Sequence, residues 1–139
     1  LIVIALIPAF GEELLFRGIL QRNFERLFRN PHTAIWLTAI LFSAFHMQFE
    51  GFLPRMLLGA MLGYMLYWAG SLWVPVIAHF VYNALQILAI YLHSNKMSPI
   101  DIDQIDETPV GLFIISIIFV LTIGYFFIQF NHVKPEKVE

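Results

Sequence analysis

The stretch MLLGAMLGYMLYWAGSLWVPVIAHFVYNALQILAIYLHSN, residues 56–95, contains no Asp, Glu, Lys or Arg. As a single α-helix it would be about 60 Å long, roughly twice the thickness of the hydrocarbon core of a bilayer. Gly70 and Pro75 divide it, because Gly commonly follows the end of a helix and Pro is accommodated in a first helical turn. We therefore predict two membrane-spanning helices here, at about 54–68 and 73–93.

Small and aromatic residues of the first of these helices have structural interpretations. Gly59 and Gly63 form a pair of small residues four apart, which lets two helices approach closely. Tyr64 and Trp68, near the end of the helix, are typical of the aromatic belt at a membrane–water boundary. We assign no ligand-binding role to the glycine pair or to the aromatic pair.

The composition as a whole is also that of a membrane protein. Of the 139 residues, 59% are hydrophobic and 13% are charged, against about 45–50% and 25% in soluble domains. The net charge is −2 and no basic face is evident, so we exclude nucleic acid as a partner. The sequence has no cysteine, which excludes disulfides, thiolate metal ligands and a cysteine nucleophile. We expect an integral membrane protein in contact with the lipid bilayer.

Two further apolar stretches, at about 33–49 and 110–130, are candidate spans. A third, at about 1–13, is shorter, and we interpret it as the downstream part of a span whose upstream half is missing. With the two helices predicted above, these three stretches predict an all-α, multi-pass transmembrane helix bundle of about five spans. The chain begins at Leu1, inside an apolar stretch and without an initiator Met. We therefore expect a piece of a longer protein, truncated at its N-terminus.

The charged residues between the spans predict an orientation. Arginines lie in the 18–32 loop and lysines in the C-terminal tail, whereas the loop at 101–107 is acidic. Alternating five spans places both basic segments on one side, which the positive-inside rule makes cytoplasmic. We accordingly predict a core at 1–93, and an extracytoplasmic acidic loop, an additional transmembrane helix and a short cytoplasmic tail at 94–139.

The basic residues of the 18–32 loop recur with helical spacing. Arg22, Arg26 and Arg29 are separated by four and three residues, and apolar residues such as Leu27 and Phe28 lie between them. This pattern suits an amphipathic helix lying in the membrane surface. An ordinary solvated basic loop is the alternative.

Polar side chains inside the predicted spans are costly, at roughly 2.5–3.5 kcal/mol for a charge at the centre of a span. They are Glu12, Glu13, Arg17, His46, His79 and Asn83. Four of these, Glu12, His46, His79 and Asn83, fall about 10–20 Å from the ends of their spans, at a rise of 1.5 Å per residue. Matched depth on three helices is how an intramembrane site is built.

Spacing assigns partners to some of these residues. Glu13 and Arg17 are four residues apart and can form an ion pair on one helix face. Glu12 points about 100° away and has no cation beside it in the sequence. Taken singly, each polar residue has a structural explanation, as a buried pair or a link between helices. Two further pairs share a helix face at the same spacing: Phe42 with His46, and His79 with Asn83.

The combination of an unpaired carboxylate, two imidazoles and a carboxamide supports two kinds of hydrolytic chemistry. A carboxylate shielded from water can act as a general base on a water molecule, and imidazole or amide N–H groups can stabilise the resulting oxyanion. Alternatively, Glu12, His46 and His79 form a His₂Glu set of the kind that binds catalytic zinc. Both routes hydrolyse an amide.

The three motifs, Glu12-Glu13-x-x-x-Arg17, Phe42-x-x-x-His46 and His79-x-x-x-Asn83, resemble those of the CAAX-processing and bacteriocin-processing (CPBP) family of intramembrane proteases. The strings GEELLFRG and GSLWVPVIAHFVYN that surround the first and third motifs are also similar to that family. The resemblance covers about residues 9–85. It implies a helical membrane protease related to the type II CAAX prenyl endopeptidases.

The resemblance also implies roles for the residues that match. Glu12 would activate the water, and His46 would act with it, either by a hydrogen bond to the water or as a metal ligand. His79 and Asn83 would stabilise the oxyanion. The remaining motif residues, Glu13, Arg17 and Phe42, would shape the site.

Several alternatives stay open at this stage. The family is often described as metalloproteases, with zinc or another divalent metal as cofactor, although a metal-free glutamate mechanism has also been proposed for it. The expected partner is a membrane-anchored protein or peptide, prenylated or not. The rival interpretations are a non-catalytic membrane scaffold, a bacteriocin self-immunity protein, and a haem protein with His46 and His79 as axial ligands.

Overall fold

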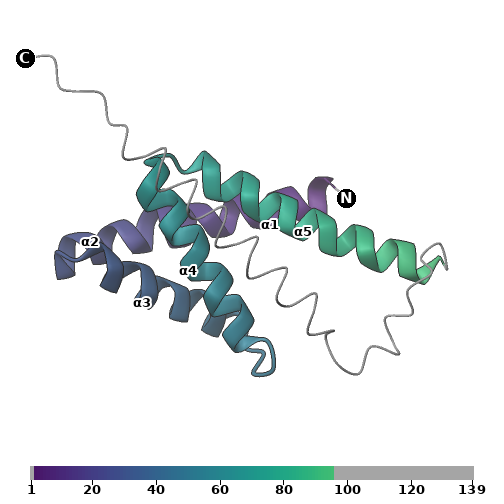
Figure 1. Cartoon of the computed structure of the whole chain (residues 1–139), viewed down its shortest axis with the longest axis horizontal. Helices are drawn as coiled ribbons and strands as arrows, with labels where there is room; N and C mark the ends of the chain where they lie inside the picture. Colours follow the sequence, from purple (N-terminus) through teal and green to yellow (C-terminus); the bar gives the residue numbers. More distant parts are fainter. Residues whose placement is uncertain (1, 96–139) are drawn as a thin grey trace, which may run out of the picture. The chain divides into compact units, whose positions relative to one another are not determined.

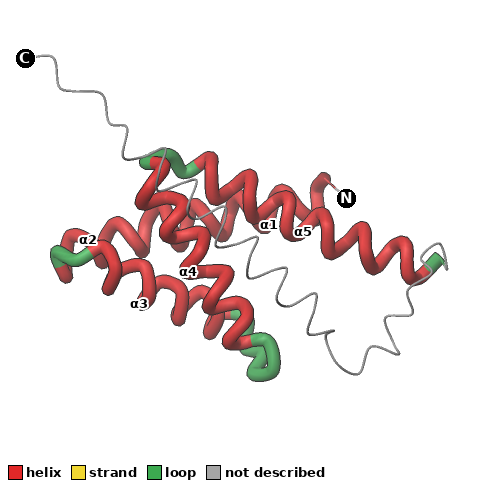
Figure 2. The backbone as a smooth tube through the Cα atoms, in the orientation of Figure 1, coloured by secondary structure: helices red, strands yellow, loops and turns green. Residues whose placement is uncertain are grey.

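The computed structural model describes residues 2–95, and every regular element in this range is helical (Figures 1 and 2). The all-α prediction is therefore confirmed for the described part of the chain. The predicted acidic loop, the span at 110–130 and the C-terminal tail lie outside the described residues. A first compact unit comprises Leu1–Ala89, and the contacts discussed below lie within it.

The N-terminal third of this unit is one uninterrupted helical run made of three elements. Helix α1 (Ile2–Glu13) continues into a π-helical segment, η1 (Leu14–Gln21), and then into α2 (Arg22–Phe28). A π-helix has wider turns than an α-helix and is often found at functional sites. Nothing in the sequence predicted it.

Helix α2 ends shortly before Pro31, because proline disfavours a helical conformation in the residue that precedes it. Arg29 adopts a left-handed conformation with φ 51°, and Asn30 then caps helix α3 (Pro31–Phe45) by accepting from the backbone N–H groups of His32 and Thr33. An Asn cap followed by Pro at the first helical position is a favourable helix start. The result is a sharp turn between α2 and α3.

Helix α3 packs against α4 (Phe52–Ala69) as an antiparallel hairpin (Figure 1). Two glycines of α4 allow the close approach: a Cβ on Gly59 would lie 3.2 Å from the Ala39 Cα, and one on Gly63 would lie 3.0 Å from Ile35 Cγ2. The sequence interpretation of these glycines as a small-residue contact site is confirmed.

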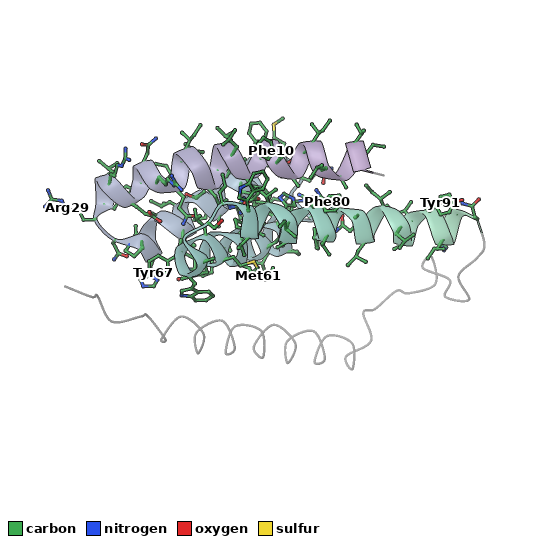
Figure 3. All side chains as sticks on the ribbon, turned by 90° about the horizontal axis from the view of Figure 1, so that it is seen from above. Phe10, Arg29, Met61, Tyr67, Phe80 and Tyr91 are labelled. Atoms are coloured by element: carbon green, nitrogen blue, oxygen red, sulfur yellow. The ribbon has the colours of Figure 1, made fainter. Side chains whose placement is uncertain are left out.

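Gly70 ends α4 in a left-handed conformation with φ 66°, and helix α5 (Trp73–Ser94) follows. The predicted break between two helices at this point is confirmed. Helix α5 runs antiparallel to α1 (Figure 3). Contacts between the two helices include a Phe10–Trp73 ring pair with centroids 6.0 Å apart.

One described helix, α5, is long and apolar enough to cross a membrane, with a mean hydropathy of 1.5. Helix α3 is apolar but shorter, because it ends at Phe45 and not at the predicted residue 49. About five spans are thus not confirmed. Large apolar side chains are nonetheless exposed all along the described surface, among them Ile4 on α1 at 67% and Ile90 on α5 at 64%, as expected of a surface facing lipid.

Candidate active site

Glu13, which is completely buried, connects two other helical segments to α1. Its Oε1 lies 2.8 Å from Nη1 of Arg17 and 2.8 Å from Nδ1 of His79. The predicted Glu13–Arg17 ion pair is confirmed. Because an ionised carboxylate can only accept hydrogen bonds, the proton of the His79 ring lies on Nδ1. Glu13 therefore fixes both the position and the tautomer of His79.

Glu12 lies on the other side of the same imidazole. Its Oε2 is 3.9 Å from Nε2 of His79, a distance too long for a hydrogen bond. The Glu12 side chain is 28% exposed, yet Oε2 itself is buried and has no hydrogen-bond partner in the protein. A carboxylate oxygen and a ring nitrogen, neither with a hydrogen-bond partner among the described residues, thus lie 3.9 Å apart.

Phe42 forms the floor of this site. Its buried ring lies beneath the Arg17 guanidinium, whose central carbon is 4.6 Å from the ring centroid, and it meets the edges of His46 and His79 with centroid distances of 5.1 and 5.9 Å. The second motif of the sequence is thereby joined to the first and third through one aromatic ring. Its contacts hold the polar groups in a mostly apolar setting.

His46 lies at the end of α3, where its Nδ1 is 2.9 Å from the Phe42 carbonyl. The carbonyl can only accept, so Nδ1 donates and Nε2 keeps its lone pair. Among the described residues no hydrogen bond or ion pair joins His46 to Glu12. The structure therefore brings His46 to the site through Phe42 and not by direct contact with the carboxylate.

Asn83 lies one helical turn beyond His79 on α5. Its Nδ2 donates to the Ala5 carbonyl of α1 at 3.5 Å, which is at the long limit for a hydrogen bond. This contact leaves most of the donor capacity of the amide available. Asn83 shares the face of His79 but forms no hydrogen bond with Glu12 or Glu13.

Sequence reasoning missed a row of buried polar side chains, Glu13, Arg17 and Gln21, that runs along the π-helix. Arg17 Nη2 donates to the carbonyl of Gly59 at 2.8 Å, and Gln21 Nε2 donates to that of Gly63 at 3.2 Å. Each of these two hydrogen bonds joins residues 42 positions apart, so η1 and α4 run in the same direction. The detectable signal was the recurrence of polar residues four apart, at 13, 17 and 21.

The metal set considered from the sequence was Glu12, His46 and His79. Both histidines donate from Nδ1 and keep Nε2 free, as metal-binding histidines do. However, within the part of the chain that the structure describes, no three His, Cys, Asp or Glu residues are grouped so that they could hold a metal ion. The residues as arranged do not fit a three-ligand site, and we derive no chemical step through a metal.

Comparison with known proteins assigns the class. Residues 1–85 match the family described as "Type II CAAX prenyl endopeptidase Rce1-like", and since this is more than half of the chain, the protein belongs to that family. The family is membrane-embedded.

The chain is also 34% identical over 88 residues to "Uncharacterized protein YpbD" of Bacillus subtilis (strain 168). The aligned region is 60% of this chain but only 42% of YpbD, so the chain spans less than half the length of that relative. No solved structure matches the chain.

Proposed function

We propose that this chain carries the active site of an intramembrane endopeptidase, which hydrolyses a peptide bond in a membrane-associated protein or peptide. Membership of a prenyl endopeptidase family supports the reaction class. The observation that carries the proposal is the buried, unpartnered Oε2 of Glu12 opposite Nε2 of His79. A carboxylate held without a partner is suited to act as a general base.

In the proposed reaction Glu12 takes a proton from a water molecule as the water oxygen bonds to the peptide carbonyl carbon. The carbonyl oxygen becomes the oxyanion of a tetrahedral intermediate. Glu12 then returns the proton to the peptide nitrogen as the C–N bond breaks. One water is consumed, and a new carboxyl group and a new amino group are released.

His79 and Asn83 are the proposed oxyanion donors. Glu13 accepts from Nδ1 of His79, as the aspartate does in a serine protease triad, and so orients the ring with Nε2 toward Glu12. In the imidazolium form, the Nε2–H of His79 would donate to the oxyanion. His46, whose Nε2 retains its lone pair, would help to orient the attacking water by accepting a hydrogen bond from it.

The topology that accompanies this function is also a proposal. About five spans place the site within the bilayer, with the 18–32 loop and the C-terminal tail in the cytoplasm. Residues 1–93 would form the catalytic core and 94–139 an accessory segment. The extensive exposed apolar surface of α1 and α5 supports embedding of the core in lipid.

A direct test uses the full chain reconstituted in lipid vesicles with a farnesylated peptide that ends in a C-a-a-X sequence. We expect mass spectrometry to detect a peptide shortened at its C-terminus with the wild-type chain and not with Glu12→Gln. Equal cleavage by both proteins would exclude Glu12 as the base. Absence of cleavage by the wild type, together with unchanged membrane peptides in producing cells, would favour a non-catalytic scaffold.

A further inference from the structure

The described surface carries a second polar feature, distinct from the active site. Arg22, Arg26 and Arg29 are all exposed, on α2 and in the turn that follows it. None of the three forms an ion pair or a side-chain hydrogen bond with another described residue. Three positive charges therefore lie uncompensated within two turns of helix.

The acidic residue of α2 does not neutralise them. Glu25 accepts a hydrogen bond at 3.1 Å from Nε2 of Gln21, whose amide is itself buried and bonded to α4. The Glu25 carboxylate therefore lies on the face of the helix that also carries the buried Gln21. Its engagement leaves the arginines as the dominant charge on the exposed face.

Exposed apolar side chains accompany the arginines. Leu27 is 70% exposed and Phe28 is 44% exposed, and α2 has no buried residue. A solvated basic loop has no reason to present such side chains, whereas a helix at a lipid–water boundary does, because its apolar side chains enter the acyl region while the guanidinium groups reach the headgroups.

Aromatic residues mark the same end of the molecule as a membrane boundary. Tyr64 and Trp68 stack with centroids 5.2 Å apart, and Tyr64 accepts or donates a hydrogen bond at 3.1 Å from Nδ1 of His32, close to the α2–α3 turn. Figure 3 shows Tyr67 and Arg29 at this end. Tyrosine and tryptophan concentrate at headgroup level in membrane proteins.

From these observations we infer that α2 and Arg29 form a binding surface for anionic phospholipid headgroups. Phosphate is the group that guanidinium donors recognise best, and the exposed apolar side chains select a lipid over a free phosphate. This inference is independent of the proposed catalysis, since no residue of the active site takes part.

The test uses the full chain in neutral detergent micelles, titrated with dioctanoyl phosphatidylglycerol and followed by tryptophan fluorescence. A juxtamembrane arginine contributes about fivefold to anionic lipid binding at low salt. We therefore expect Arg26→Gln to weaken binding about fivefold and the triple variant Arg22→Gln/Arg26→Gln/Arg29→Gln roughly 100-fold. The matched control is Arg55→Gln, which removes a charge from the first turn of α4, at the end of the α3–α4 hairpin away from α2. This variant should bind as the wild type does.

Three further titrations, all of the wild-type chain, distinguish a lipid headgroup from a free phosphate. They do not depend on the folding of any variant. Dioctanoyl phosphatidylcholine and glycerol phosphate should each bind the wild type far more weakly than phosphatidylglycerol does. Salt at about 0.5 M should weaken phosphatidylglycerol binding to the wild type, since exposed charges are screened over about 4 Å at such ionic strength. Equal binding by wild type and triple variant, equal affinity for free glycerol phosphate, or no effect of salt would each overturn the assignment.

Discussion

His79 donates from Nδ1 to Glu13 at 2.8 Å, although 66 positions separate the two residues in the sequence. The same carboxylate oxygen accepts from Arg17 at 2.8 Å. One buried oxygen therefore holds together the first and third sequence motifs and determines which ring nitrogen of His79 faces Glu12.

Glu13→Gln should destabilise the protein and impair catalysis for two different reasons. The buried Arg17 guanidinium would lose its counterion, which costs about 3–5 kcal/mol, and His79 would lose the charged acceptor of its Nδ1 proton. Thermal unfolding in detergent and the rate of peptide cleavage measure the two effects.

The double variant Glu13→Gln/Arg17→Met separates these effects. It removes the orphaned charge, so we expect thermal stability to recover by most of the loss while cleavage stays slow. Recovery of both stability and cleavage would mean that Glu13 serves only to neutralise Arg17.

His79→Gln should reduce the cleavage rate by about 100-fold or more, because removing one oxyanion donor typically has an effect of that size. The matched control is His32→Gln, which alters an exposed histidine on α3 that bonds to Tyr64. We expect the control to retain the wild-type rate. Similar rates for the two variants would remove His79 from the reaction.

Gly59→Ala should destabilise the protein by about 1–3 kcal/mol, the usual cost of overpacking. The added Cβ would lie 3.2 Å from the Cα of Ala39 and 3.1 Å from the Phe42 ring, and the backbone cannot yield cheaply. Gly11→Ala is the control, because nothing lies within 4 Å of its Cβ position and Ala is the better helix former by about 1 kcal/mol. Equal melting temperatures for the two variants would contradict the close packing of α3 and α4.

Metal analysis tests the zinc alternative. Since no three-ligand group is assembled among the described residues, we expect elemental analysis of purified, active protein to find no stoichiometric zinc and expect cleavage to survive a chelator. About one zinc per chain that is lost in His46→Ala would instead establish the His₂Glu site predicted from the sequence.

The boundaries of the helices were accessible from the sequence where single residues decide them. Asn30 and Pro31 stop one helix and start the next, and Gly70 separates α4 from α5, because the conformational preferences of these residues are local. Glu13 and Arg17 could be paired for the same reason, as neighbours on one helix face. The extent of α3 was overestimated because apolar composition continues past its end at Phe45 while the helix does not.

Tertiary contacts were beyond sequence reasoning. The π-helical turn has no sequence signature here, and Gln21 was overlooked because a lone glutamine near an arginine-rich segment looks like a surface residue. Gln21 is buried because α4 passes close to it at Gly63, whose backbone carbonyl accepts a hydrogen bond from the Gln21 amide. Likewise, the bond from His79 to Glu13 could not be inferred, since spacing along one helix does not determine contacts between helices.

The central claim, that Glu12 enables this chain to hydrolyse peptide bonds in the membrane, is tested most directly in cells that produce either the wild-type chain or Glu12→Gln at equal levels. Quantitative mass spectrometry of peptide ends in the isolated membranes detects cleavage whichever membrane protein is the substrate. We predict new C-termini in wild-type membranes that are at least about 100-fold less abundant with Glu12→Gln, the effect expected from loss of a general base. Identical sets of peptide ends in the two membranes would contradict the claim.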